Sequence, residues 1–386
     1  MNNGNFAALR HLRDLGVDAH LFLYSDEPRH FLPQNDTWHW DRWAPFVHRL
    51  AVSNGGLDAV LTGGGALRRQ LQGYDVYVGS GFAPVLFGKL GWRLDLFLPY
   101  AEGVEFIVHH SIRWRRPLST AFSWVRKRLM ERALKRQVKA IGAANLHALS
   151  VATFQRLQLQ PVVLPALALY PEAAPDAATW PASVNALVDR MKRSPMVVFS
   201  HVSHIWKNLP FAHFFGGLGK RNQWLIEGFE RYVKRSGQRE ALLCLFEYGT
   251  DVAASKELVT RLGIEAQVLW FPTMSRRELT GLMRHVDIGG SEFAGMLWGG
   301  CGWEFLSAGV PMLHQLDNPQ DYDRPDEPLA PFFNVQSPDD IAAVLLAHDR
   351  ASLRAAGARA RAWFDAHHGV ALARRYVNLL EQLRRQ

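Results

Sequence analysis

The feature that most constrains the fold is the alternation of short apolar strands with helical segments along the whole chain. Residues 5–15 carry apolar side chains at helical spacing, and residues 17–23 then alternate between apolar and polar as a strand does. Further strands are predicted at 76–78, 94–98, 106–108, 196–199, 242–245, 268–271 and 287–289. Because parallel strands are usually joined through helices, this alternation predicts an α/β fold with parallel sheets.

A change in composition after residue 165 divides the chain into two halves. Prolines and alanines dominate there and large apolar residues are few, which is typical of a linker. With 386 residues the chain is long enough for two full cores. We predict an N-terminal Rossmann-like domain (1–170), a linker (171–195), a second Rossmann-like domain (196–350) and C-terminal helices (351–386).

The first residues have the composition of a loop that follows a strand, although no such strand precedes them in this sequence. Residues 1–5 are Met-Asn-Asn-Gly-Asn and run directly into the first helical segment. Three interpretations are open: a truncated start, a central strand supplied by another segment, or a disordered terminus over residues 1–4.

A glycine-rich loop enters a helix within residues 291–311, SEFAGMLWGGCGWEFLSAGVP. Backbone N–H groups at a helix N-terminus attract anions, and glycines let a diphosphate approach the chain closely. Glu304, near the start of this helix, can accept hydrogen bonds from sugar hydroxyls. The pattern favours a nucleotide site, and the alternative is that the glycines only shape a turn and Glu304 only favours the helix dipole.

The segment Glu304-Phe-Leu-Ser-Ala-Gly309-Val-Pro311 resembles the glutamate-to-Gly-x-Pro segment of retaining glycosyltransferases with the two-domain GT-B fold. The resemblance implies two Rossmann-like domains that face a cleft, with a C-terminal helix crossing back to the first domain. It also implies that Glu304 binds the ribose of a nucleotide diphosphate sugar, and that the sugar is transferred with retention.

The resemblance is incomplete at the second acidic position of the motif. That residue usually lies eight positions before the glutamate, where this chain has Met296. Glu292 is the nearest acidic candidate, at the end of the preceding strand. The sequence leaves open whether Met296 abolishes activity.

Two lysines are candidates for the cation that the family places on the donor phosphates. Residues 199–207 and 220–229 resemble its basic strand end and the helix that follows, which makes Lys207 and Lys220 the candidates. A cation there stabilises the charge that builds on the leaving diphosphate. The alternative for either is a surface lysine, and the family's arginine is not obvious here.

The remaining donor-side assignments follow from the same resemblance. The backbone around Pro272 and Met274 is expected to face the base, Ser275 to act as a helix N-cap, and the Gly4 loop to face the donor or the acceptor. The predicted donor-binding residues are Glu304, Gly300, Cys301, Gly302, Trp303, Pro272, Met274 and Gly4.

On the acceptor side, Glu102 and His109 follow apolar strands. The resemblance implies that Glu102 orients an acceptor hydroxyl and that His109 contacts the donor sugar. A surface carboxylate and a structural histidine are the alternatives.

Positive charge is concentrated between residues 113 and 139, within a net charge of +8 for the chain. Ten basic residues stand there against Glu131 alone, and Phe122, Val125, Leu129 and Ala133 recur at helical spacing. A solvated helix face, a surface for anionic lipid headgroups and a nucleic-acid surface compete as interpretations. The last is disfavoured, because no nucleic-acid-binding module is recognised.

Composition limits where in the cell we expect the protein and which cofactors we expect it to use. No apolar run approaches the roughly 20 residues of a membrane-spanning helix, no signal peptide opens the sequence, and two cysteines cannot form a disulfide framework. We expect a cytoplasmic protein with peripheral attachment to the inner face of the membrane. No Asp-x-Asp motif is found, so neither a metal nor a cofactor is expected.

The resulting prediction is a metal-independent, hexosyltransferase-like enzyme that takes a nucleotide sugar and a saccharide or lipid-linked acceptor, in bacterial surface polysaccharide or glycolipid assembly. Two alternatives remain open. One is a non-catalytic GT-B-like protein that binds a membrane or a partner, and the other is a sugar-nucleotide epimerase.

Overall fold

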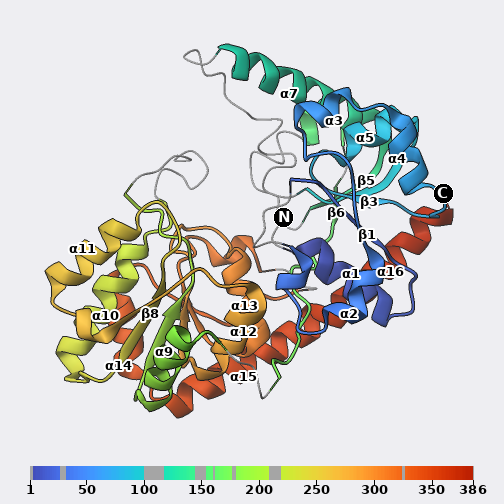
Figure 1. Ribbon diagram of the computed structural model, residues 1–386. Helices are drawn as coiled ribbons and strands as arrows, with labels where there is room; N and C mark the ends of the chain where they lie inside the picture. The colour runs from blue at the N-terminus through green and yellow to red at the C-terminus, as the bar shows by residue number, and fades with distance from the viewer. Residues whose placement is uncertain are drawn as a thin grey trace. The chain divides into compact units, whose positions relative to one another are not determined.

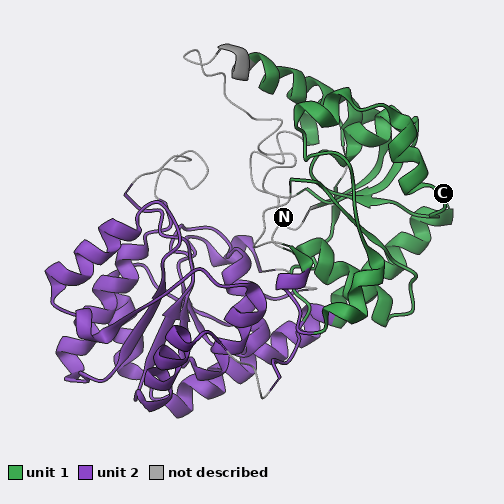
Figure 2. Cartoon of the chain, viewed as in Figure 1, with its two compact units in different colours: residues 1–33, 39–170, 370–386 green, residues 34–38, 171–369 purple. Residues whose placement is uncertain are grey.

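The computed structural model describes residues 3–26, 32–99, 117–143, 154–159, 161–175, 180–207, 219–323 and 327–385. The chain forms two compact units, shown in Figure 2: unit 1 contains Met1–Pro33, His39–Tyr170 and Val370–Gln386, and unit 2 contains Gln34–Trp38 and Pro171–Gly369. Each unit is built from parallel strands and helices, as the sequence predicts (Figure 1).

Unit 1 holds two separate parallel sheets, one with the order β1-β2 and one with the order β3-β4-β5-β6. Its strands are β1 (Leu21–Leu23), β2 (Val47–Arg49), β3 (Val78–Gly79), β4 (Leu94–Phe97), β5 (Val138–Ala143) and β6 (Pro161–Val163). Its helices are α1 (Gly4–Asp14), α2 (Trp40–Trp43), α3 (Leu57–Leu61), α4 (Gly64–Leu71), α5 (Ala83–Leu90), α7 (Pro117–Gln137) and, from Val370 on, α16 (Gly369–Arg385).

The last helix of the chain, α16, packs on unit 1 although the helix before it belongs to unit 2. Leu372, Tyr376 and Leu380 are buried in one cluster with Leu96 and Leu164 of unit 1. The phenol of Tyr376 donates a hydrogen bond of 2.8 Å to a backbone carbonyl at residue 165. The C-terminal helix therefore crosses back to the first unit, as the resemblance implies.

Unit 2 has one six-stranded parallel sheet with the order β12-β11-β10-β7-β8-β9. Its strands are β7 (Val197–Ser200), β8 (Leu242–Phe246), β9 (Val268–Phe271), β10 (Ile288–Gly290), β11 (Met312–His314) and β12 (Phe333–Asn334). Its helices are α9 (Ala182–Arg193), α10 (Asn222–Ser236), α11 (Val252–Leu262), α12 (Arg276–Leu282), α13 (Gly300–Ala308), α14 (Pro338–Ala347) and α15 (Arg350–His367).

The strand order reverses beside β7. The chain runs from β7 to β8 and β9 on one side and then places β10 on the other side of β7. Glycines in β10 let the helices α10 and α13 pack closely against this strand. A Cβ at Gly289 would lie 2.5 Å from Phe305 of α13, and one at Gly290 would lie 2.6 Å from Leu225 of α10. In open α/β sheets the ligand crevice lies at the carboxyl ends of strands at such a reversal.

The segment expected to be a linker contributes to unit 2. Helix α9 lies within it and buries Val184, Val188 and Met191, which share one face at spacings of four and three residues. The carboxylate of Glu172 accepts a hydrogen bond of 3.0 Å from the hydroxyl of Thr37, which joins the segment 34–38 to unit 2.

The basic helix α7 packs on unit 1 through its second half. Met130 and Leu134 are fully buried there, whereas Trp124 is 52% exposed and Val125 is 40% exposed. Of the apolar face expected from the sequence, Ala133 is buried and Val125 is not. Met130, Ala133 and Leu134 of its second half share one buried cluster with residues of α5 such as Leu86 and Leu90.

Candidate functional site

Glu304 of α13 lies at the centre of a buried charged cluster in unit 2. Its Oε2 is 2.5 Å from Nε2 of His201, the residue after β7, and its Oε1 is 2.6 Å from Nε of Arg276, the first residue of α12. A second carboxylate, Asp36, lies 3.5 Å from the Arg276 guanidinium. The Glu304 carboxylate thus links its own helix α13 to the end of β7 through His201 and to α12 through Arg276.

The partners of Glu304 keep its carboxylate ionised. Burial alone would raise the pKa of Glu304, but Arg276 and His201 lower it below its usual value. Burial alone would lower the pKa of His201, whereas attraction by Cys301 and Glu304 raises it to about 10. At neutral pH the cluster therefore contains an ionised glutamate between an imidazolium and a guanidinium.

A second ion pair lies at the glycine-rich loop. Nζ of Lys220 is 2.8 Å from Oε1 of Glu292, and the N–H of Gly299 donates to Oε2 of the same carboxylate at 3.0 Å. Burial would raise the pKa of Glu292, but Lys220 lowers it; burial would lower the pKa of Lys220, but Glu292 and then Cys301 raise it. Two residues predicted to be catalytic, Lys220 and Glu292, are thus brought together.

Cys301 connects the two clusters, because its sulfur raises the pKa of both His201 and Lys220. It is the second residue of α13, so the predicted phosphate-binding amides of residues 300–303 form the first turn of that helix. The N–H groups of a first turn carry the positive end of the helix dipole, and here those of Gly302 and Trp303 donate to the carbonyl of Gly299 at 3.2 and 3.5 Å. Lys220, His201 and Arg276 come from three separate segments and interact with Cys301 or Glu304 of this helix.

The glycine loop leaves little room for a side chain at two of its positions. A Cβ on Gly302 would lie 2.4 Å from Trp298, and one on Gly299 would lie 3.0 Å from the Glu292 carboxylate. Trp303 packs its ring 4.1 Å from the ring of His368, so its side chain belongs to the packing of unit 2. Only its backbone remains a candidate for phosphate binding.

Met296 fixes the same loop through its backbone. Its carbonyl accepts a hydrogen bond of 2.8 Å from Nε2 of His314, which is fully buried. Burial lowers the pKa of His314, which favours the neutral ring at neutral pH. The residue that replaces the usual acid therefore lies in an ordered part of the loop.

The structure separates the two candidate lysines. The side chain of Lys207 is exposed, and its backbone N–H donates to Asp251 at 2.7 Å. Lys220 is instead mostly buried against Glu292.

The other sequence-predicted residues have the following positions. Pro272 is exposed and Met274 half-buried in the loop between β9 and α12, and Ser275 forms a capping box with Glu278, which confirms its N-cap role. Gly4 is the first residue of α1 in unit 1. Glu102 and His109 lie outside the described residues.

Sequence reasoning assigned no role to His201 or Arg276. The available signal for His201 is its place directly after a fully buried central strand, beside the reversal of strand order. The signal for Arg276 is weaker, since it is only the basic residue that follows the cap Ser275.

One group among the described residues has the composition of a metal site. The ligand atoms of His201, Cys301 and Glu304 all lie within 4.8 Å of one another. Sulfur, imidazole and carboxylate together suit Zn²⁺. In this arrangement both Glu304 oxygens already contact cationic side chains.

No protein-family profile matches the sequence, and no curated protein matches it. Several solved structures are similar to the protein. HepE of Anabaena, in complex with UDP and glucose, aligns with a TM-score of 0.59 at 13% identity over 98% of this chain and 96% of its own. WaaG, a glycosyltransferase involved in lipopolysaccharide biosynthesis, aligns with a TM-score of 0.56 at 16% identity over 98% and 95%.

A third similar structure is the sucrose-phosphate synthase of Thermosynechococcus elongatus, with a TM-score of 0.55 at 14% identity over 97% of this chain and 91% of its own. These alignments span nearly the whole chain and both of its units. The protein therefore has the GT-B fold, the fold class that the Glu304 segment implied.

Proposed function

We propose that this protein is a glycosyltransferase that moves a sugar from a nucleoside diphosphate sugar to a saccharide or lipid-linked acceptor. The observation that carries the proposal is the convergence of Lys220, His201 and Arg276 at the amino end of α13, where the strand order reverses. Because the leaving group is a diphosphate, a site of oriented cations and helix amides is what its departure requires.

Each cation is positioned by a carboxylate before a ligand arrives. Lys220 is paired with Glu292, and His201 and Arg276 are paired with Glu304. An ammonium group has three donors, so Lys220 can hold Glu292 and still reach a phosphate oxygen. In this proposal Lys220 stabilises the leaving diphosphate, and Glu292 positions Lys220.

Glu304 is assigned to the ribose. An ionised carboxylate has about four lone-pair sites, and His201 and Arg276 occupy two directions. The others can accept hydrogen bonds from the two ribose hydroxyls. The N–H groups of Gly300 and Cys301 at the start of α13 then bind phosphate, since those of Gly302 and Trp303 donate to the carbonyl of Gly299. The backbone at Pro272 and Met274 faces the base.

Retention and metal independence are part of the proposal. Lys220 and the α13 amides supply the positive charge that a metal would otherwise provide. We expect transfer to continue in excess EDTA and the product to keep the donor's anomeric configuration by NMR. Loss of activity in EDTA with recovery on Zn²⁺ would instead assign His201, Cys301 and Glu304 to a metal.

We further propose that the enzyme works beside an anionic membrane on its cytoplasmic face, in surface polysaccharide or glycolipid assembly. Within the described residues no helix is long and apolar enough to span a bilayer. The support for peripheral attachment is the exposed Trp124 and Val125 on α7 beside Lys127, Arg128 and Arg132. Interfacial aromatics next to basic residues are how peripheral helices bind anionic lipid.

A thermal-shift screen with UDP, GDP, ADP, CMP and dTDP tests the donor site. A ligand that binds only the folded state raises its stability, so one nucleotide should increase Tm selectively. UDP is the first probe, because HepE was solved with it. The gain should be lost in Glu304→Gln, which keeps hydrogen-bonding capacity toward His201 but removes the charge.

The control is Lys234→Ala, which removes an ion pair with Glu230 on α10, outside the Glu304 cluster. This variant should keep the full nucleotide shift. Absence of any shift in well-folded wild-type protein would contradict the donor site and favour the non-catalytic, membrane- or partner-binding alternative.

A further inference from the structure

Asp36 brings a carboxylate from the first part of the chain to the Glu304 cluster. It lies in the segment 34–38, which belongs to unit 2 although the residues on both sides belong to unit 1 (Figure 2). Its side chain is 2% exposed, and its Oδ1 lies 3.5 Å from Nη1 of Arg276. Nε of the same guanidinium lies 2.6 Å from Oε1 of Glu304. Arg276 therefore links the segment 34–38 to the proposed ribose ligand.

The residues that follow Asp36 are fixed to unit 2. The carboxylate of Glu172 accepts hydrogen bonds from the Thr37 hydroxyl at 3.0 Å and from the Trp38 N–H at 3.3 Å. The guanidinium of Arg277 donates to the Thr37 carbonyl at 3.1 Å and lies 5.1 Å from the centre of the Trp38 ring. Because Thr37 is also completely buried, the Asp36 carboxylate is attached to a well-defined piece of backbone.

The backbone of Arg276 is equally well placed. Arg276 is the first residue of α12, and the capping box between Ser275 and Glu278 fixes the start of that helix. The next residue, Arg277, already binds the segment 34–38 through the Thr37 carbonyl. Both partners of the Asp36–Arg276 pair are thus anchored, so the pair can fix a position as well as supply charge.

The orientation of the Arg276 guanidinium depends on a second contact. The group is planar and carries five N–H donors. One hydrogen bond at Nε leaves the plane able to rotate about that bond, whereas a carboxylate on the Nη1 side holds it. Asp36 also balances charge, because His201 and Arg276 carry two positive charges against one negative charge on Glu304. Unbalanced buried charge is costly.

We propose that Asp36 is a positioning residue of the donor site: it holds Arg276, Arg276 holds the Glu304 carboxylate, and the site thereby prefers ribose over deoxyribose in the nucleotide. Asp36 itself does not touch the ligand. The inference rests on the proposed function, in which Glu304 accepts hydrogen bonds from the ribose hydroxyls.

The test compares the Kd of UDP with that of 2′-deoxy-UDP by isothermal titration calorimetry, or the corresponding pair for another base if the thermal-shift screen selects one. Wild-type protein should bind the ribose form roughly 10- to 100-fold more tightly, the usual effect of one hydrogen bond to a charged group. In Asp36→Asn, which has nearly the same shape but no charge, this ratio should fall by roughly 5-fold or more. Both Kd values are measured on the same protein, so a general loss of stability cancels in the ratio.

A double-mutant cycle places the effect on Arg276. Arg276→Lys keeps the positive charge but lacks the planar fork that faces two carboxylates, so it should lower the ratio as Asp36→Asn does. Adding Asp36→Asn to Arg276→Lys should then cause little further change, because both substitutions break the same link. Independent, additive losses would mean that Asp36 does not act through Arg276.

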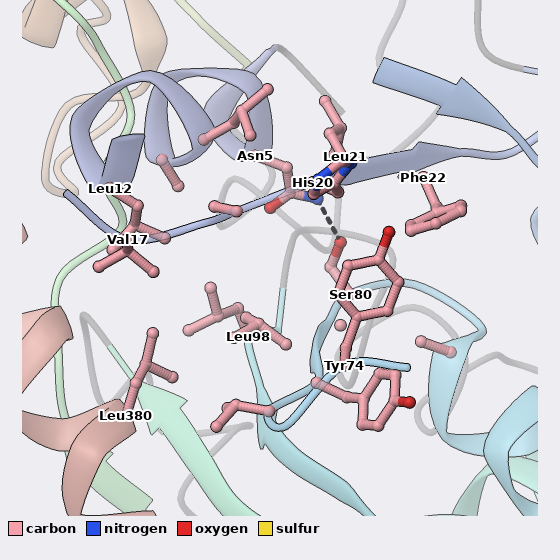
Figure 3. Close-up of a pocket in the computed structure, with 18 of the residues that line it drawn as sticks. Asn5, Leu12, Val17, His20, Leu21, Phe22, Tyr74, Ser80, Leu98 and Leu380 are labelled. Atoms are coloured by element: carbon pink, nitrogen blue, oxygen red, sulfur yellow. Dashed lines mark hydrogen bonds between the residues drawn. The ribbon is translucent and has the colours of Figure 1, made fainter. Parts of the chain in front are cut away.

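Two controls should keep the full ratio. Asp339→Asn makes the same chemical change at an acid of unit 2 that pairs with Arg231 and Arg235. Leu380→Ala weakens unit 1 at the wall of its cavity of about 520 Å³ (Figure 3). The second control matters because the segment 34–38 is continuous at both ends with unit 1, and it should lower Tm without changing the ratio.

The outcomes separate this inference from the proposed function. If the wild type prefers ribose and Glu304→Gln loses the preference while Asp36→Asn keeps it, the role of Asp36 is wrong and the donor site stands. If the wild type binds the nucleotide without any preference for ribose, the assignment of Glu304 fails and this inference fails with it.

Discussion

At the scale of single residues, the proposed donor site is a set of cations that are each held by a carboxylate. Glu304 is buried, and burial of an ionised group is costly unless it is paired. Its two partners supply that pairing, which keeps it ionised and fixes both of them. The residue is thus both a structural centre of the cluster and the proposed ribose ligand.

The raised pKa of His201 predicts how stability depends on pH. The histidine titrates near 6.5 when unfolded and near 10 when folded, so its contribution is complete below pH 6.5 and is lost as pH rises toward 10. Urea unfolding at pH 6, 8 and 10 should show the free energy of unfolding falling progressively over this range because of this group.

The decline should be smaller in His201→Asn. His204→Asn is the matched control, because burial lowers the pKa of His204 to about 4 and its titration lies outside this range. A decline of the same size in His201→Asn would mean that another group causes it.

Transfer kinetics should distinguish the two candidate lysines. Lys220→Met should lower kcat by roughly 100- to 1,000-fold, the usual loss when an electrostatic stabiliser of the leaving charge is removed. Lys207→Met should leave kcat nearly unchanged, because its side chain is exposed and away from the Glu292 pair. The rate of sugar release from the nucleotide sugar is the measurement.

Lys220→Met leaves Glu292 buried without its partner, so loss of folding has to be separated from loss of catalysis. The double variant Lys220→Met with Glu292→Gln removes the buried charge as well. If that double variant is folded and keeps the wild-type rate, Lys220 has no catalytic role.

At the scale of elements, α7 combines two environments in one helix. Its second half contributes Met130 and Leu134 to the core, and its first half exposes Trp124 and Val125 beside basic side chains. The guanidinium of Arg128 lies 5.2 Å from the Trp124 ring, which keeps charge and aromatic surface together. This pattern is what the proposed lipid surface requires.

Vesicle sedimentation tests this surface. Trp124→Ser with Val125→Ser should weaken binding to vesicles containing anionic phosphatidylserine by roughly 30-fold or more, since each of the two buried apolar groups contributes about 1 kcal/mol or more. Leu346→Ser, at a similarly exposed apolar position on α14, is the control and should bind as wild type. Equal binding of all three proteins to anionic vesicles, or equal binding of the wild type to neutral and anionic vesicles, would argue against this lipid surface.

The sequence predicts the longer elements well and the contacts between them poorly. The expected strand at 268–271 coincides with β9, and the expected helix over 5–15 corresponds to α1. Strand β5 had no expected counterpart, because it follows α7 without a turn residue to mark the change. Local patterns such as hydrophobic periodicity and glycine before a helix carry this part of the information.

The pairing of His201 with Glu304 joins residues 103 positions apart, so no local pattern could predict it. The same holds for Lys220 and Glu292, which the sequence offered as separate candidates. Their pairing depends on β7 and β10 being neighbours, and that follows from the strand order of the whole sheet. Glu304, by contrast, stands in a short motif and was predicted from it.

At the scale of the whole molecule, the chain passes between the two units more than once. Residues 34–38 belong to unit 2 although their neighbours on both sides belong to unit 1, and the last helix returns to unit 1 after α15. Neither unit is therefore a continuous stretch of sequence. The core of unit 1 includes residues of α16 that are separated from the rest of the unit by the whole of Pro171–Gly369.

Ending the chain at Gly369 tests this dependence, because it removes the part of α16 that belongs to unit 1. Unit 1 would lose the buried side chains of Leu372, Tyr376 and Leu380, each worth about 1.5–3 kcal/mol. That sum is comparable with the roughly 5–15 kcal/mol by which a domain is stable. Calorimetry should show that the unfolding transition of unit 1 is lost or strongly lowered, while the nucleotide-dependent shift persists, because Lys220, Glu292 and Glu304 all lie in unit 2. Tyr376→Phe is the milder control: it removes only the hydrogen bond to the carbonyl at residue 165 and should lower stability by about 1 kcal/mol. An intact unit 1 transition in the shortened chain would show that α16 is not needed for the first core.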